Sequence, residues 1–210
     1  MRSNHVVLLR KKVAREAALL LYTSQEKEFK QAKLKAVGVL GTRILPSNLE
    51  VALELDQIAD EFEGEIRRAR LTQMRKEALE IMSKLKDFNP RLIGSVWRGT
   101  AYKNSDIDIV VFSSHPRLLV DHLQKAGFKI AKTEHVSKTS DGEAEGSFHI
   151  HLDLPSGNEA EIIVRNLEEI SREEICEIYG DTVKGLSFIQ LEKILKEEPT
   201  RRFLPNRIRV

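Results

Sequence analysis

Residues 91–113 read RLIGSVWRGTAYKNSDIDIVVFS. An apolar segment before Gly94-Ser95 and a second one after Asp106 predict a strand, a tight turn with a short helix, and a second strand. Successive side chains of a strand point to opposite faces of its sheet. Asp106 and Asp108 are therefore expected to share one face, while the apolar residues beside them enter the core.

The two aspartates indicate a metal site. Two carboxylates held this close repel each other unless a cation lies between them. Oxygen ligands of this kind suit a hard ion such as Mg²⁺ or Mn²⁺. A lone Asp-x-Asp is also common on a solvated strand face, but Gly94 would let the backbone approach an anion just upstream, and Ser95 adds a hydroxyl donor. The pattern favours a site that handles phosphate together with a metal.

This segment resembles the signature of the nucleotidyltransferase superfamily related to DNA polymerase β, and most of all the minimal nucleotidyltransferases. The likeness lies in Gly94-Ser95, a gap of ten residues and Asp106-Ile107-Asp108, and it covers about residues 90–166. It implies an α+β fold, with a small mixed β-sheet that carries helices on one face. It also implies an enzyme that transfers a nucleoside monophosphate from an NTP to a hydroxyl and releases pyrophosphate, using two Mg²⁺ or Mn²⁺ ions.

The superfamily's chemistry needs a third carboxylate, and Glu161 matches it as an isolated acid in the apolar segment 159–165. If the apolar residues of this segment and of the strand predicted over 146–154 pack on the same helices, Asp153 lies on the face of Glu161. Asp153 is thus the alternative third acid. The open face would also carry His149 and His151.

The resemblance assigns roles to individual residues. Asp106, Asp108 and Glu161 are expected to be the catalytic residues and the metal ligands. The expected nucleotide-binding residues are Gly94, Ser95, Arg98 and Lys103, with Arg165 a weaker candidate.

Two other features of this region have competing interpretations. Trp97 is predicted to be a packing residue rather than a platform for a base. The pattern His149-x-His151-x-Asp153 could also bind zinc. Alternate residues of one strand project in parallel, however, and would need a further ligand from elsewhere to surround an ion.

The flanking segments predict helices and further strands. A long amphipathic helix is expected over 10–35, a second begins at the capping box Ser47-x-x-Glu50, and a third runs over 65–87. Another helix follows Pro116, strands are expected over 129–139 and 146–154 around a turn at 140–143, and a last helix follows Phe188. A second capping box, Ser171-x-x-Glu174, predicts a helix that ends near Gly180.

These elements suggest three parts: an N-terminal helical region over 1–63, a catalytic domain over 64–166, and short C-terminal helices with a basic tail over 167–210. The N-terminal helices could pack on the catalytic domain or form a homodimer.

Charge is unevenly distributed although the net charge is only +2. Residues 1–45 hold ten Lys and Arg against three acids, whereas residues 46–66 hold seven acids and no base. One interpretation is that these two segments pair with each other. The other is that the basic arm follows a polyanion such as RNA.

The remaining composition narrows the class of protein. One cysteine, Cys176, excludes an internal disulfide framework, and no apolar run is long enough to span a bilayer. We expect a cytoplasmic enzyme with no membrane partner, which acts on a macromolecular acceptor, RNA or protein; a small-molecule acceptor is a further option. The alternative is a non-catalytic, antitoxin-like binding module that retains the fold.

Overall fold

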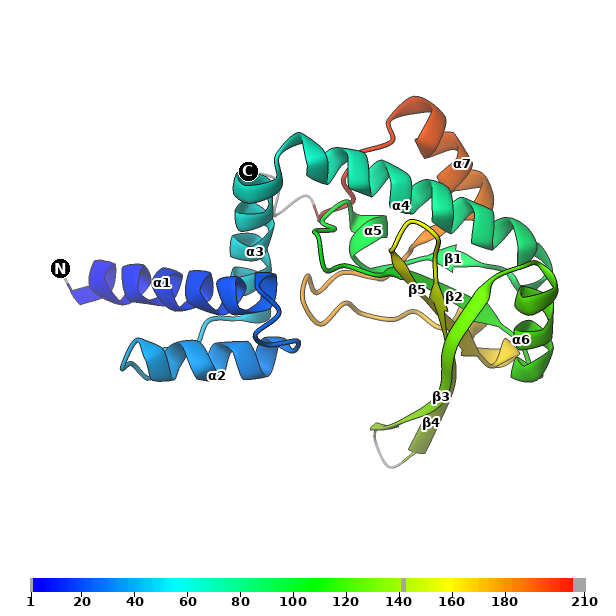
Figure 1. Cartoon of the computed structure of the whole chain (residues 1–210). Coiled ribbons are helices and arrows are strands. Elements are labelled where there is room, and N and C mark those ends of the chain that lie inside the picture. The colour runs from blue at the N-terminus through cyan, green and yellow to red at the C-terminus, as the bar shows by residue number, and fades with distance from the viewer. Residues whose placement is uncertain (1, 141–142, 206–210) are drawn as a thin grey trace.

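The computed structural model describes residues 2–140 and 143–205, with side chains for residues 5–136 and 146–205. Within these ranges it forms a six-stranded sheet with helices on one face and a helical lobe at the N-terminal side (Figure 1). The α+β fold with a mixed sheet is therefore confirmed. None of the described helices is both long and apolar enough to cross a membrane.

The strands follow the order β3-β4-β5-β2-β1-β6 across the sheet. β2 and β5 are parallel neighbours, and every other pair is antiparallel. The strands are β1 (Arg91–Leu92), β2 (Ile107–Phe112), β3 (Lys129–Ser140), β4 (Glu143–Asp153), β5 (Glu159–Arg165) and β6 (Leu186–Ser187).

The principal core lies between the sheet and its helices. Alternate residues of β2, beginning with Ile107 and Ile109, are fully buried there together with Ile162 of β5. They meet the apolar stripes of the helices α4 (Glu65–Lys84), α5 (Gly94–Arg98), α6 (Pro116–Lys125) and α7 (Phe188–Glu197). Trp97 belongs to this core at 5% exposure, which agrees with its predicted packing role. The residues that alternate with the buried ones along β2 and β5, including Asp108 and Glu161, point to the opposite face of the sheet.

A second, smaller core holds the N-terminal lobe together, from α1 (Arg2–Tyr22), α2 (Phe29–Val39) and α3 (Asn48–Glu63). The capping box predicted at Ser47 and Glu50 begins α3. The expected single helix over 10–35 is wrong, because two helices occupy that segment. The chain leaves α1 through Ser24, which has a left-handed φ of 57°, and its amide donates to Leu21 O at 3.0 Å.

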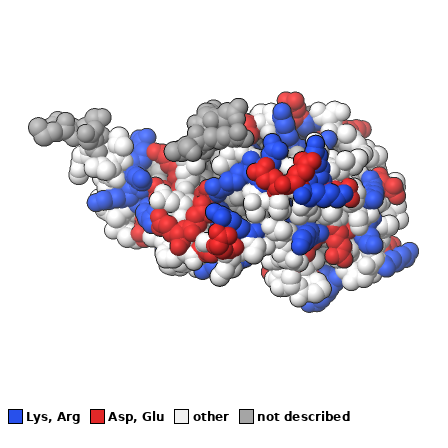
Figure 2. Space-filling view, turned by 90° about the horizontal axis from the view of Figure 1, so that it is seen from above, with Lys and Arg blue, Asp and Glu red and all other residues white. Residues whose placement is uncertain are grey.

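Ion pairs join the basic and acidic segments of this lobe. Arg15 contacts Glu61 at 2.6 Å and Glu54 at 3.4 Å, and Lys11 lies 3.8 Å from Glu54. On the face seen in Figure 2, Lys and Arg side chains are interspersed with Asp and Glu. Part of the basic segment is thus paired with the acidic segment within the lobe, as the first of the two interpretations predicted.

The helix expected from Ser171 to Gly180 is also wrong. A 3₁₀ turn at Leu167–Ser171 comes first, with its capping box at Asn166 and Glu169. Beyond it the chain turns back on itself without a helix, and the amide of Cys176 donates to Asp181 O at 2.8 Å. The segment is held in this form because Asp181 pairs with buried Arg98 and Tyr179 is buried against Ala52.

The hairpin of β3 and β4 extends beyond the rest of the sheet (Figure 1). It contains the turn predicted at 140–143, of which residues 141 and 142 lie outside the described residues.

Candidate active site

Three carboxylates from two neighbouring strands meet on the open face of the sheet. Asp108 on β2 lies directly opposite Glu161 on the parallel strand β5, and Asp106 immediately precedes β2. One carboxylate oxygen from each of the three lies within 4.8 Å of the other two. The parallel register therefore brings together the three acids predicted as a group.

The electrostatics of this group favour a cation. Burial, reinforced by the charges of Asp106 and Glu161, raises the pKa of Asp108 well above its usual range. Asp106 is more exposed, yet loss of solvent around its carboxyl and the charge of Glu161 raise its pKa as well. A divalent ion among these oxygens would reverse the cost of holding them ionised and close together.

Gly94 lies against the carboxylate of Asp108. Its φ is +68°, and a Cβ atom at this position would fall 1.9 Å from Asp108 Oδ2. The next backbone amide upstream, that of Ile93, donates to Asp108 O at 2.9 Å. Glycine is required at position 94 because of its positive φ and because the Asp108 carboxylate occupies the place of a Cβ atom. It also begins α5, whose first amides have no acceptor within the helix, and Ser95 follows at once.

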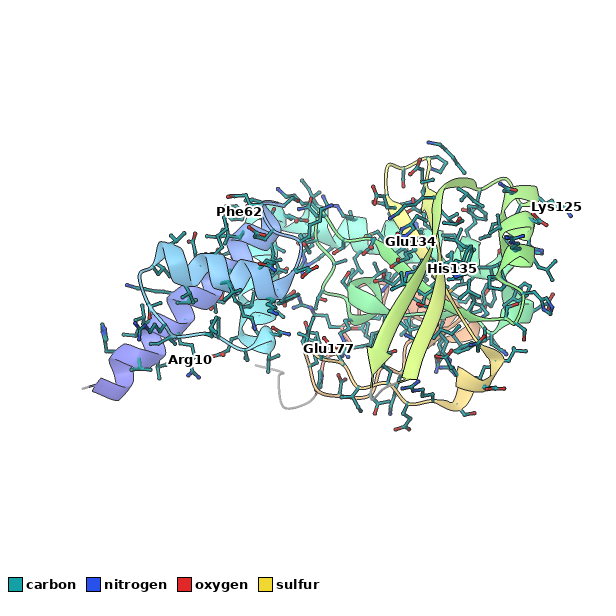
Figure 3. All side chains as sticks on the ribbon, turned by 90° about the horizontal axis from the view of Figure 1, so that it is seen from below. Arg10, Phe62, Lys125, Glu134, His135 and Glu177 are labelled. Carbon is teal, nitrogen blue, oxygen red and sulfur yellow. The ribbon has the colours of Figure 1, made fainter. Side chains whose placement is uncertain are left out.

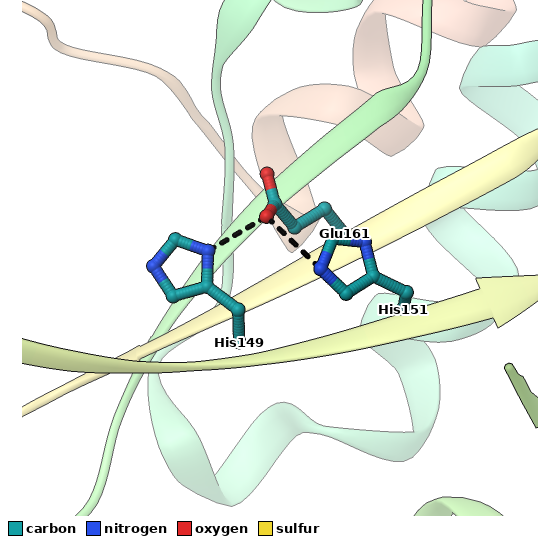
Figure 4. A group of neighbouring side chains, drawn as sticks. All are labelled: His149, His151 and Glu161. Atoms are coloured by element: carbon teal, nitrogen blue, oxygen red, sulfur yellow. Dashed lines mark hydrogen bonds and ion pairs between the residues drawn. The ribbon is translucent and has the colours of Figure 1, made fainter. Parts of the chain in front are cut away.

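Glu161 is held from its other side by histidines of β4 (Figure 4). Its Oε1 lies 2.6 Å from His149 Nδ1 and 3.5 Å from His151 Nε2. Asp153, the alternative third acid, shares this face but pairs with Lys129 at 2.5 Å, and its register partner is Glu159. The geometry thus groups Glu161, and not Asp153, with the two aspartates.

Arg98 does not face this site. It is 3% exposed, and its guanidinium donates to both carboxylate oxygens of Asp181, at 2.7 and 3.1 Å, and to Phe203 O at 3.1 Å. The guanidinium also lies over the aromatic rings of Trp97 and Tyr179. We correct its expected nucleotide-binding role to a structural one, because burial and these partners hold it beneath the turn.

Lys103 stays on the surface but is turned towards the N-terminal lobe. Its Nζ lies 4.3 Å from the ring centre of Tyr22, and its amide donates to Glu63 at 3.0 Å. Asn104 adds a bond to Tyr22 O at 2.9 Å. The loop that leads into Asp106 is therefore attached to the end of α1.

Two buried arginines of α4 support the site and were not predicted. Arg67 donates to Ala101 O at 2.7 Å and Thr100 O at 2.8 Å, and pairs with Asp56 of α3. Arg75, fully buried, donates to Val96 O at 3.1 Å and Trp97 O at 2.9 Å. Both fix the backbone between the glycine turn and Asp106. Their spacing in the sequence places both arginines on the apolar stripe of α4. A charged residue on such a stripe is the sequence signal that could have identified them.

Clefts lie near the candidate site, although none of the three carboxylates lines them. One, of about 290 Å³, is lined by His149 and Ile163 of the sheet and by the segment from Glu169 to Ile175. Arg165 lines it too and pairs with Glu174 at 2.8 Å. The cleft thus adjoins the site through His149, which contacts Glu161.

A mixed sheet that gathers three carboxylates beside a glycine turn is the arrangement that the resemblance to nucleotidyltransferases predicted. Residues 75–176 match the sequence model of the nucleotidyltransferase domain. This match confirms the expected resemblance to nucleotidyltransferases over that segment.

Other comparisons give weaker likenesses. Cid1 bound to the UTP analogue UMPNPP shares 20% identity at a TM-score of 0.34, over 50% of this chain and 35% of that one. A cytoplasmic RNA terminal U-transferase shares 22% identity at a TM-score of 0.29, over 57% of this chain and 34% of that one. This chain spans about a third of the length of these structures, and at such scores they say nothing of its substrate. No curated protein sequence matches the chain.

Proposed function

We propose that the protein is a Mg²⁺- or Mn²⁺-dependent enzyme that transfers a nucleoside monophosphate from an NTP to a hydroxyl of a macromolecular acceptor, RNA in preference to protein. The observation that carries this proposal is the convergence of Asp106, Asp108 and Glu161, whose oxygens lie within 4.8 Å of one another on an open face. A binding module has no need of three carboxylates that repel each other.

The donor set fits hard divalent cations, since it consists of carboxylate oxygens only. Asp106 and Asp108 would hold the ion that accompanies the triphosphate, and all three acids would hold a second. When bound, such ions polarise the phosphoryl group and lower the pKa of the attacking hydroxyl. The contribution of the chain is to hold the three carboxylates side by side, so that a bound cation can keep them ionised at neutral pH.

The glycine turn is the proposed place for the β- and γ-phosphates. Gly94 has no side chain to block their approach, and the first amides of α5 point away from the helix. The Ser95 hydroxyl supplies a further donor. Arg75 supports this arrangement from below by binding the carbonyls at the end of α5.

An RNA acceptor is supported by basic residues that the lobe itself leaves unpaired. Among the described residues of α1, α2 and their loops, five exposed side chains have no acidic partner: Arg10, Lys12, Lys27, Lys30 and Arg43. The end of α1 contacts the loop before Asp106, so this surface belongs to the same body as the site.

The test is transfer of label from each NTP to total RNA or to lysate protein, with Mg²⁺ present. Asp106→Asn combined with Asp108→Asn should reduce transfer by at least about 10³-fold, because several kcal/mol of charge stabilisation leave with the metal. Asp153→Asn is the matched control, an acid on the same face that pairs with Lys129, and it should keep transfer near the wild-type rate. No transfer from any NTP, alongside partner binding that survives the double substitution, would establish the binding module instead.

The acceptor is tested separately by salt. RNA affinity should fall steeply as salt increases, and Lys27→Glu with Lys30→Glu should weaken it and reduce the slope by roughly 2. If affinity ignores both changes, the basic surface is not the RNA site.

A further inference from the structure

A second group of potential ligands adjoins the three carboxylates. It consists of His149 and His151 on β4 and Glu161 on β5, with one donor atom from each within 4.8 Å of the others (Figure 4). Their side chains are 14%, 25% and 19% exposed, so the group is sheltered but reachable. Glu161 belongs to both groups.

The sequence shows the two histidines but not their third partner. Alternate residues of one strand project in parallel, and by themselves they leave one side of an ion uncovered. The antiparallel register places Glu161 directly opposite His151, and its carboxylate reaches back to both rings. The neighbouring strand thus supplies the ligand that β4 lacks.

The donor types separate this group from the all-carboxylate one. Imidazole nitrogen suits zinc and other transition-metal ions, whereas Mg²⁺ prefers oxygen. Zinc binds nitrogen at about 2.0–2.1 Å and carboxylate oxygen at about 2.0–2.2 Å, so tetrahedral ligand atoms lie about 3.3 Å apart. Ligand atoms already within 4.8 Å need only small side-chain rotations to reach that spacing.

The surroundings of the His149 ring meet a further requirement of such a site. A histidine that binds a metal through one nitrogen donates from the other to a nearby acceptor, which fixes its orientation. His149 Nε2 lies 2.7 Å from Ser147 Oγ, which leaves Nδ1 for the ion. His151 Nε2, the nitrogen that faces Glu161, also lies 2.9 Å from Glu134 Oε1 on β3, which pairs with Lys132 as well. Figure 3 labels Glu134 on the hairpin of β3 and β4.

We propose that His149, His151 and Glu161 form a binding site for a transition-metal dication such as Zn²⁺, distinct from the hard-cation site and sharing Glu161 with it. Occupancy of this site draws the Glu161 carboxylate towards the imidazoles and away from Asp106 and Asp108. Zn²⁺ is then an inhibitor of the Mg²⁺-dependent reaction, a consequence that rests on the proposed nucleotidyl transfer, whereas the binding site itself does not.

The first experiment uses Co²⁺ as a spectroscopic probe on the full chain. Four-coordinate Co²⁺ with nitrogen ligands absorbs visible light far more strongly than six-coordinate Co²⁺ among oxygens. We expect the strong band in the wild-type protein, its competition by Zn²⁺, and its persistence when Asp106→Asn and Asp108→Asn are combined. His149→Ala with His151→Ala should remove the band and weaken Zn²⁺ affinity by at least about 100-fold.

A matched control is available on the same hairpin. His135 lies on the opposite face, against Phe148, so His135→Ala removes an imidazole without touching the group, and it should leave the band unchanged. Far-ultraviolet circular dichroism establishes that each variant is folded. A wild-type spectrum without the strong band, or an unchanged band in the folded double-histidine variant, would overturn the site.

The second experiment measures transfer with Mg²⁺ in excess and increasing Zn²⁺. The wild-type protein should lose transfer as Zn²⁺ fills the site, and His151→Ala should require at least about tenfold more Zn²⁺ for the same loss. Equal sensitivity of the two proteins would overturn the inhibitory link. If no NTP supports transfer at all, the proposed function fails, and the Co²⁺ experiment still decides the metal site.

Discussion

Replacement of Gly94 by alanine adds one methyl group where the glycine turn meets the carboxylate of Asp108. The new Cβ would lie 1.9 Å from Asp108 Oδ2 and 2.8 Å from Asp108 Cγ. Ordinary contacts begin near 3.4 Å, so the carboxylate oxygen must move by about 1.5 Å. Rotation of the carboxylate alone does not suffice, because Asp108 Cβ is itself only 3.2 Å away.

The displacement sets the expected loss of function. A misplacement of about 1 Å in a catalytic group can reduce a rate about 100-fold, which corresponds to about 2.7 kcal/mol in the barrier. Gly94→Ala should therefore lower transfer by about 100-fold or more and weaken Mg²⁺ binding. The φ of +68° adds roughly 1–2 kcal/mol of backbone strain to the folded state.

Gly157→Ala separates the clash from the strain. Gly157 has a φ of +88° in the turn between β4 and β5, and an added Cβ would meet nothing within 4 Å. Both variants should lose the stability that the backbone strain costs, seen as about 2–4 °C in Tm for each kcal/mol, and Gly94→Ala should lose more because of its clash with Asp108. Only Gly94→Ala should lose transfer, measured by single-turnover kinetics at saturating NTP. Transfer within a fewfold of wild type in folded Gly94→Ala would refute the reasoning.

Three further predictions concern stability. Because the pKa of Asp108 is raised in the folded state, its ionisation destabilises the metal-free protein as pH rises through the unfolded and then the folded pKa. Asp108→Asn should raise the Tm of that protein at pH 7, the gain should vanish near pH 4, and Mg²⁺ should stabilise only the wild type; a lower Tm would contradict this. Arg75→Ala should lower the free energy of unfolding by about 3 kcal/mol or more, since it leaves buried carbonyls unpaired. Arg15→Ala, at a half-exposed ion pair, should cost only about 1 kcal/mol by urea denaturation; equal losses for the two arginines would refute the distinction.

The strands and their faces could be predicted from sequence because their alternation is a local signal. β5 begins and ends where the apolar pattern does, and its parity placed Glu161 on the face of the histidines. The alternation of a strand shows which residues share a face but not which residues of two strands lie opposite each other. The choice between Glu161 and Asp153 as the third acid therefore had to come from the pairing of β5 with β2.

The errors arose where a distant partner overrides the local pattern. Ser171 and Glu174 form a valid capping signal, but Asp181 is drawn to Arg98, 83 residues earlier in the chain, and the segment follows it. Arg98 looked like a phosphate ligand because it follows the glycine turn by one helical turn. The direction of its side chain depends on the segment around Asp181 that packs against it, and a short stretch of sequence around Arg98 does not contain that segment.

The partners of Arg75 are also far apart along the chain. Its guanidinium donates to Pro199 O at 2.7 Å and Arg201 O at 2.8 Å, the second acceptor 126 residues downstream. At about 5–20 residues per second, a ribosome needs roughly 6–25 s to make that interval. Until then the buried charge lacks half of its acceptors. Arg75, which holds the carbonyls of Val96 and Trp97 in α5, therefore gains its full set of acceptors only after Arg201 has been made.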